Sequence, residues 1–86
     1  MYREEMILQN ETGLHARPAS ILVKEASVFK SEISLIKDDK KYNAKSIINL
    51  LSMGAAKGDQ LVIEAEGEDE EIAVKELIKI INNLNG

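Results

Sequence analysis

Along this chain, short segments of alternating apolar and polar residues are interspersed with segments in which apolar residues recur at helical spacing. This order of segments limits the fold more than any other feature. Four segments are expected to form strands, because alternating β-favouring residues or flanking turn-forming residues define them. Asp38 and Asp39 form a turn between two of them, which favours a hairpin. The expected strands are residues 4–9, a segment around Ile33 and Leu35, residues 41–44 and residues 60–66.

The first helix is expected near the only proline of the chain. From Ala19 the apolar residues recur at the i, i+3, i+4, i+7 spacing of one helix face. Proline is accepted in the first helical turn, where its missing N–H would have no partner. The helix should therefore begin between His15 and Pro18 and end at about residue 27 or 28. Its core face should consist of Ala19, Leu22, Val23 and Ala26.

Two more helices are expected in the second half of the chain. Ser46 precedes an apolar run and Gly54 follows it, a pattern typical of the N-cap and the end of a helix of about two turns. Acidic residues at 69–71 indicate the first turn of a last helix, because the positive end of the helix dipole favours them. The core stripe of that helix should consist of Ala73, Leu77, Ile80, Ile81 and Leu84.

The resulting order, β-α-β-β-α-β-α, predicts a fold of class α+β, in which helices cover one face of an antiparallel sheet. A chain of 86 residues should form one domain, over residues 1–86. The acid-rich stretch from Glu64 to Glu71 is expected to be a solvated strand edge and helix start without chemistry of its own.

Composition argues against several classes of protein. Hydrophobic residues make up 44% of the chain and charged residues 30%, as in ordinary globular proteins. The chain has no cysteine and one histidine, so we expect no disulfide, no metal site and no cofactor. The apolar runs are too short to span a bilayer or form a signal peptide, so we expect a cytoplasmic protein without membrane insertion. A net charge of −4 and 3% aromatic residues argue against nucleic-acid binding.

The segment TGLHARPAS, residues 12–20, contains the only histidine and the only proline. Gly13 permits a sharp turn before the helix entrance, where backbone N–H groups and the helix dipole form an anion site near His15, Ala16 and Arg17. Arg17 adds a fork-shaped phosphate ligand. A neutral imidazole is a nucleophile, and these groups would stabilise a phosphoryl group on its ring. The segment predicts a histidine that accepts and releases phosphate; alternatively, His15 is only a turn residue near a helix cap.

These residues resemble the active-site signature of HPr, the family of histidine-containing phosphocarriers in the bacterial phosphoenolpyruvate-dependent sugar phosphotransferase system. The segment from Lys45 to Gly54 is similar to the family's second signature, around a regulatory serine, and the segment from Gly67 to Glu70 resembles its turn into the last helix. The resemblance covers nearly the whole chain. It implies an open-faced β-sandwich, with a four-stranded antiparallel sheet of order 1-4-2-3 covered on one face by three helices.

The resemblance also implies a function. His15 would accept phosphate on Nδ1 from phosphorylated Enzyme I and pass it to the IIA domain of a sugar permease. Arg17 would help to place the phosphate, the backbone amides around Ala16 and Arg17 would hold its oxygens, and Pro18 would set the helix entrance. We therefore expect a phosphotransfer component rather than an independent enzyme, and we expect it to be a monomer.

Ser46 resembles the serine that the ATP-dependent HPr kinase/phosphorylase phosphorylates in some members, with a catabolite-control regulator as a further partner; alternatively, it only caps a helix. Ile47, Ile48 and Leu51 resemble an exposed apolar docking patch of the family. The family commonly has Met-Gly where this chain has Ile48-Asn49, which bears on partner choice and on the serine kinase step.

Two other hypotheses stay open. The chain could be a regulatory interaction module, of a catabolite-control or nitrogen-branch paralogue, that acts through Ser46 and the adjacent apolar patch. Regulatory paralogues of one kind have glutamine in place of the histidine, and this chain has His15. A small-molecule-binding α+β module is the other hypothesis, but no glycine-rich phosphate loop supports it.

Overall fold

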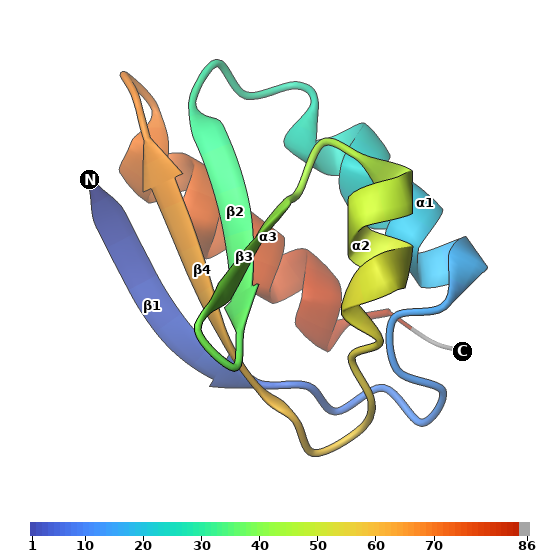
Figure 1. Ribbon diagram of the computed structural model, residues 1–86. Helices are drawn as coiled ribbons and strands as arrows, with labels where there is room; N and C mark the ends of the chain where they lie inside the picture. Colours follow the sequence, from blue (N-terminus) through green and yellow to red (C-terminus); the bar gives the residue numbers. More distant parts are fainter. Residues whose placement is uncertain (85–86) are drawn as a thin grey trace.

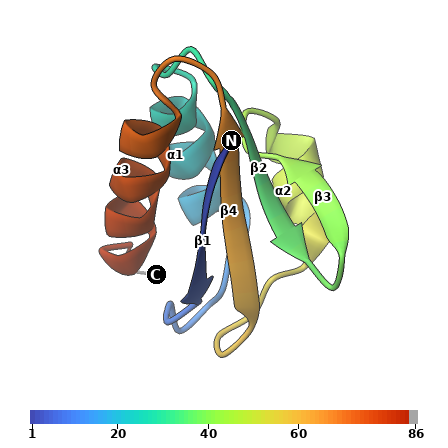
Figure 2. The ribbon, with the colours of Figure 1, turned by 90° about the vertical axis from the view of Figure 1, so that its left-hand side faces the viewer.

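The computed structural model describes residues 1–84, which form a four-stranded antiparallel sheet with three helices on one face and an open opposite face (Figures 1 and 2). The strand order is β1-β4-β2-β3, so the expected open-faced α+β sandwich is confirmed. No helix within residues 1–84 is long and apolar enough to cross a membrane. The elements are β1 (Tyr2–Ile7), α1 (Ala16–Ala26), β2 (Glu32–Lys37), β3 (Lys40–Asn43), α2 (Ile47–Met53), β4 (Gln60–Glu66) and α3 (Glu70–Asn82).

The alternation in β4 decides which side chains enter the core. Ile63 pairs with Glu4 of β1 and Leu35 of β2, and it points to the helix-covered face together with Leu61 and Ala65. All three of these β4 side chains are buried, and the strand has the predicted bounds.

The first strand begins and ends two residues earlier than the predicted segment 4–9. It stops at Ile7 because Leu8 hydrogen-bonds with the loop before β4: its N–H donates to the Asp59 carbonyl at 2.9 Å, and its carbonyl accepts from the Gly58 N–H at 2.8 Å. The second hairpin strand is likewise one residue early, at Lys40–Asn43 rather than 41–44.

Packing of the helices differs in detail from the predicted stripes. Val23 is half-buried, as are Ile80 and Leu84, whereas Val74, absent from the predicted stripe of α3, is fully buried. Val74 lies three positions before Leu77 and seven before Ile81, so it belongs to the same face. The stripe of α3 is thus rotated toward Val74, and Ile80 lies at its margin.

The prediction of a solvated, acid-rich strand edge is wrong at Glu64. Strand β4 lies between β1 and β2, and Glu64 is only 4% exposed although it points to the open face of the sheet. Its carboxylate is paired with Arg3 of β1 and with Lys41 of β3, the latter at 2.8 Å. The Lys41 hydrogen bond, with help from Arg3 and against the effect of burial, lowers the pKa of Glu64. One carboxylate therefore links three strands.

Asp69 ties the N-terminus of α3 to the turn that follows α1. Its carboxylate accepts hydrogen bonds from the backbone N–H groups of Lys30 and Ser31, at 2.8 and 2.9 Å, and from the Ser31 hydroxyl. These bonds, that from the Ser31 hydroxyl foremost, lower the pKa of Asp69 to about 2. The two long helices are thereby fixed against each other at one end.

Candidate functional site

The predicted helix entrance is confirmed at His15. The first helical hydrogen bond runs from the Ala19 N–H to the His15 carbonyl at 2.9 Å, so His15 is the N-cap and Ala16 the first residue of α1. Pro18 directly precedes the first bonded N–H, so its missing donor removes no helical bond. Arg17 is helical although it precedes a proline, a position that usually disfavours helix.

The turn before His15 depends on Gly13. Its backbone has a φ of 68°, in the left-handed region, and its N–H donates to the Asn10 carbonyl at 3.1 Å. A Cβ on this residue would lie 2.3 Å from the carbonyl oxygen of Ala55, and that same oxygen accepts the Leu14 N–H at 3.1 Å. Glycine therefore lets the segment before His15 lie directly against the chain that leaves α2.

Asn10 is a site residue that sequence reasoning missed. It is buried, and its Nδ2 donates to the Leu84 carbonyl at 3.3 Å, while its own carbonyl accepts the Gly13 N–H. The turn is thus fixed to the end of α3 as well as to the end of α2. A polar residue at the start of the turn-forming segment 10–13 was the only signal, and it is equally typical of an ordinary turn.

The chemistry offered at the helix entrance suits an anion. His15, Ala16 and Arg17 are all exposed, and the first turn of α1 contains no acidic residue. The backbone N–H groups of Ala16 and Arg17 have no helical acceptor, so they and the helix dipole attract negative charge. The guanidinium of Arg17 belongs to the same turn. The helix start and Arg17 thus supply N–H donors and a positive charge, the groups that a phosphoryl group attached to an imidazole would need.

The predicted features of α2 are also present. Ser46 is the N-cap, its Oγ accepts the Asn49 N–H at 3.3 Å, and Gly54 ends the helix with a φ of 64°. Ile48 is 76% exposed and Leu51 42% exposed, whereas Ile47 is half-buried against the core. Two of the three residues of the predicted docking patch thus face solvent.

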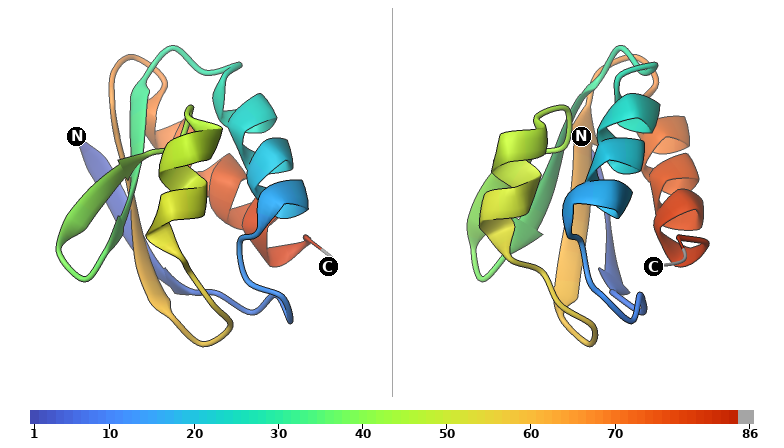
Figure 3. Two further views of the ribbon diagram at one scale, coloured as in Figure 1. Left: turned by 45° about the vertical axis from the view of Figure 1, so that its right-hand side comes forward. Right: turned by 90° about the vertical axis from the view of Figure 1, so that its right-hand side faces the viewer.

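A further exposed apolar side chain lies on α1, and the sequence analysis did not name it. Helices α1 and α2 lie side by side on the sheet (Figure 3), and α1 carries an exposed apolar side chain, Ile21, which is 41% exposed. Its signal was present in the sequence, because Ile21 is apolar but lies outside the predicted core stripe of that helix.

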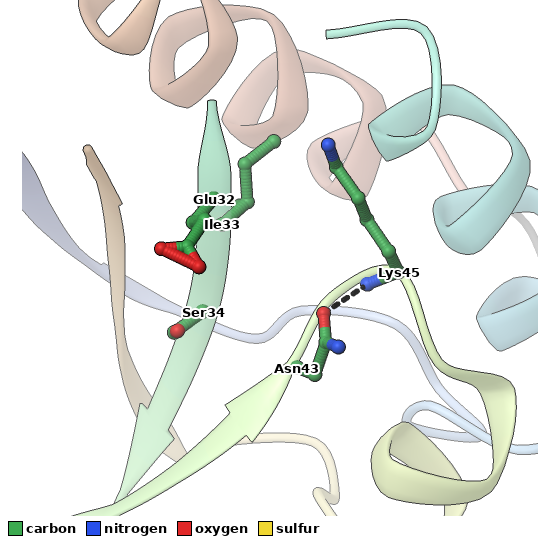
Figure 4. A pocket seen from close by; sticks show the side chains of 5 residues that line it. All are labelled: Glu32, Ile33, Ser34, Asn43 and Lys45. Carbon is green, nitrogen blue, oxygen red and sulfur yellow. Dashed lines mark hydrogen bonds between the residues drawn. The ribbon is translucent and has the colours of Figure 1, made fainter. Parts of the chain in front are cut away.

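A cleft of about 350 Å³ lies away from the residues predicted to bind phosphate. It opens between the start of β2 and the end of β3 (Figure 4), and none of its lining residues belongs to the segment around His15. Lys45 spans this region and donates from Nζ to the Phe29 carbonyl at 2.7 Å. The cleft is lined by Glu32, Ile33, Ser34, Asn43 and Lys45.

Comparison with known proteins identifies the family. The family model described as the PTS HPr component phosphorylation site matches residues 2–83. The chain is 43% identical over 83 residues to the phosphocarrier protein HPr of Borreliella burgdorferi, with 96% of each chain covered. The crystal structure of HPr from Thermoanaerobacter tengcongensis is similar with a TM-score of 0.91 and 46% identity, covering 95% of this chain and 92% of that one. The chain therefore belongs to the HPr family of phosphocarrier proteins of the phosphotransferase system.

A relative that bears a different name is equally similar in sequence. The HPr-like protein Crh of Bacillus subtilis is 43% identical over 77 residues, which cover 90% of this chain and 91% of that protein. Overall identity therefore does not separate the HPr proteins from the HPr-like protein Crh.

Proposed function

We propose that the protein relays phosphate within the phosphotransferase system. His15 accepts a phosphoryl group from phosphorylated Enzyme I, which obtains it from phosphoenolpyruvate, and passes it to the IIA domain of a sugar permease. The observation that carries the proposal is the position of His15 as N-cap of α1, directly before two N–H groups without helical acceptors and beside Arg17. Family membership supports it.

The transfer needs little from the protein beyond placement and charge. The neutral imidazole nitrogen attacks the phosphorus, and the bond between phosphorus and the donor breaks as the new nitrogen–phosphorus bond forms. The N–H groups of Ala16 and Arg17 and the guanidinium of Arg17 stabilise the phosphoryl oxygens. The same groups hold the phosphate until an acceptor nitrogen attacks it in turn, so no further reactant is required.

A two-stage transfer tests the donor and the acceptor together. The protein is incubated with phosphoenolpyruvate and catalytic Enzyme I, separated from them, and mixed with a purified IIA domain. We expect an acid-labile phosphoryl group that moves to the IIA domain. The Arg17→Lys variant should react more slowly, because an ammonium group lacks the planar fork that binds two phosphate oxygens. Retention of the label in the presence of several different IIA domains would contradict the relay.

We also propose that Ser46 is a regulatory site next to the docking patch. Ser46 is half-buried and lies one residue before α2, whose Ile48 and Leu51 are exposed, so phosphate there would change the surface that partners meet. Incubation with ATP and HPr kinase/phosphorylase should give acid-stable phosphate on Ser46. Such labelling, together with phosphorylation-dependent binding to a catabolite-control regulator and no labelling of His15, would favour the purely regulatory module instead.

A further inference from the structure

Asn49 forms hydrogen bonds around Ser46 that a helix cap alone does not need. The Ser46 Oγ accepts the backbone N–H of Asn49 at 3.3 Å, which is the cap bond, and it also accepts from Nδ2 of the same residue at 3.3 Å. The Oδ1 of Asn49 accepts the backbone N–H of Asn43, again at 3.3 Å. The side chain of Asn49 therefore bridges the end of β3 and the hydroxyl of Ser46.

The orientation of this amide is fixed by its partners. A backbone N–H can only donate, so Oδ1 faces Asn43 and Nδ2 must face Ser46. Asn43 is itself held in place: its Oδ1 accepts the Lys45 N–H at 2.9 Å (Figure 4), and its carbonyl accepts the Ser46 N–H at 3.1 Å. The corner between β3 and α2 is thus one hydrogen-bonded unit with Asn49 at its centre.

The consequence concerns the reactivity of the Ser46 oxygen. A hydroxyl oxygen has two lone pairs, and here two N–H donors of Asn49 engage them. To be phosphorylated, this oxygen must attack the γ-phosphorus of ATP with one lone pair. The bond from that phosphorus to the β–γ bridging oxygen breaks, ADP leaves, and the hydroxyl proton passes to a base of the kinase. The cap bond can persist through this step, but the side-chain bond must be released.

We propose that Asn49 is a positioning residue that slows phosphorylation of Ser46 by an ATP-dependent serine kinase. The inference rests on the proposed regulatory role of Ser46 and adds a control of the rate at which this site is phosphorylated. Loss of the Asn49 side chain frees one lone pair of Ser46 while the cap bond from the backbone remains. A neutral hydrogen bond of this kind corresponds to a change of roughly threefold to tenfold in rate.

The test compares kinase kinetics on the full chain for the wild type, Asn49→Ala and a matched control, Ser52→Ala. The control removes another exposed side-chain bond of the same helix, from the Ser52 Oγ to the Asn49 carbonyl at 2.7 Å, without touching Ser46. Acid-stable phosphate is measured by intact mass with HPr kinase/phosphorylase and ATP. We expect kcat to rise roughly threefold to tenfold in Asn49→Ala, with KM within about twofold, and no change in Ser52→Ala.

The outcomes separate this inference from the regulatory role itself. Equal kcat values in wild type and Asn49→Ala, a change confined to KM, or the same rise in Ser52→Ala would overturn the role of Asn49 and leave Ser46 a kinase substrate. If neither the wild type nor Asn49→Ala is labelled while another HPr is labelled in the same reaction, both the inference and the regulatory role of Ser46 are overturned. Transfer of phosphate from Enzyme I to His15 is measured in parallel, and neither of these outcomes bears on it.

Discussion

Replacement of Gly13 by alanine should be far more damaging than the small size of the change suggests. Gly13 has a φ of 68°, and in that region an L-residue costs roughly 1–2 kcal/mol. The new Cβ would lie 2.3 Å from the Ala55 carbonyl oxygen, whereas carbon and oxygen atoms ordinarily approach to about 3.3 Å. That carbonyl must therefore retreat by about 1 Å, which breaks its bond from the Leu14 N–H, a further loss of roughly 1–3 kcal/mol.

Gly54 provides the matched control. Its φ of 64° is nearly the same as that of Gly13, but nothing lies within 4 Å of the Cβ that alanine would add. The Gly54→Ala variant therefore carries only the backbone cost, and any gain from a stiffer unfolded chain is common to both variants. The difference between the two unfolding free energies isolates the clash with Ala55, and we expect it to be about 1–3 kcal/mol.

Urea unfolding followed by far-ultraviolet circular dichroism measures this difference, because the chain has no tryptophan to report by fluorescence. A domain of this size has a total stability of roughly 4–13 kcal/mol, so Gly13→Ala removes a large part of it. The rate of phosphorylation by Enzyme I should also fall more in Gly13→Ala than in Gly54→Ala. Equal destabilisation by the two substitutions would refute the close approach of residues 13 and 55.

Three other substitutions test separate parts of the structure. Glu64→Gln should lower the unfolding free energy at pH 7, because the lowered pKa of Glu64 means that its ionised form stabilises the fold. This deficit should shrink below pH 4.5, where the stabilising charge is progressively lost, and urea titrations at several pH values measure it. Asp39→Gly should stabilise the protein by about 1 kcal/mol in the same assay, because Asp39 has a φ of 66° in the β2–β3 turn. Ile48→Ser should raise the KM for Enzyme I about tenfold and leave the unfolding midpoint unchanged, because this side chain is exposed and apolar.

Local signals in the sequence predicted the elements and the helix entrance well. The run from Ser46 to Gly54 contains its own start and stop, and α2 has the predicted bounds. Pro18 indicated where the first helix begins, and α1 does begin within the predicted interval. Order and spacing of the elements, together with resemblance to a known family, then led to the correct sheet.

Features that depend on neighbours in space were beyond such signals. The burial of Glu64 follows from the central position of β4 and from cations on two other strands, and no periodicity contains that information. The contact of Gly13 with Ala55 joins two loops far apart in the sequence. The bond from Asn49 to Asn43 likewise requires the corner between β3 and α2 to be folded. Local pattern therefore predicts where the helices and strands begin and end, but not the contacts that hold them against one another.

Phosphate relay through His15 is tested most directly by the intact mass of the protein after incubation with phosphoenolpyruvate and Enzyme I. We expect the wild type to gain one phosphoryl group, brief acid treatment to remove it, and His15→Ala to gain none. His15 is the only histidine, so no other imidazole can substitute for it. An unchanged mass of the wild type with an Enzyme I that phosphorylates another HPr, or acid-labile labelling of His15→Ala, would contradict the central claim that His15 relays phosphate.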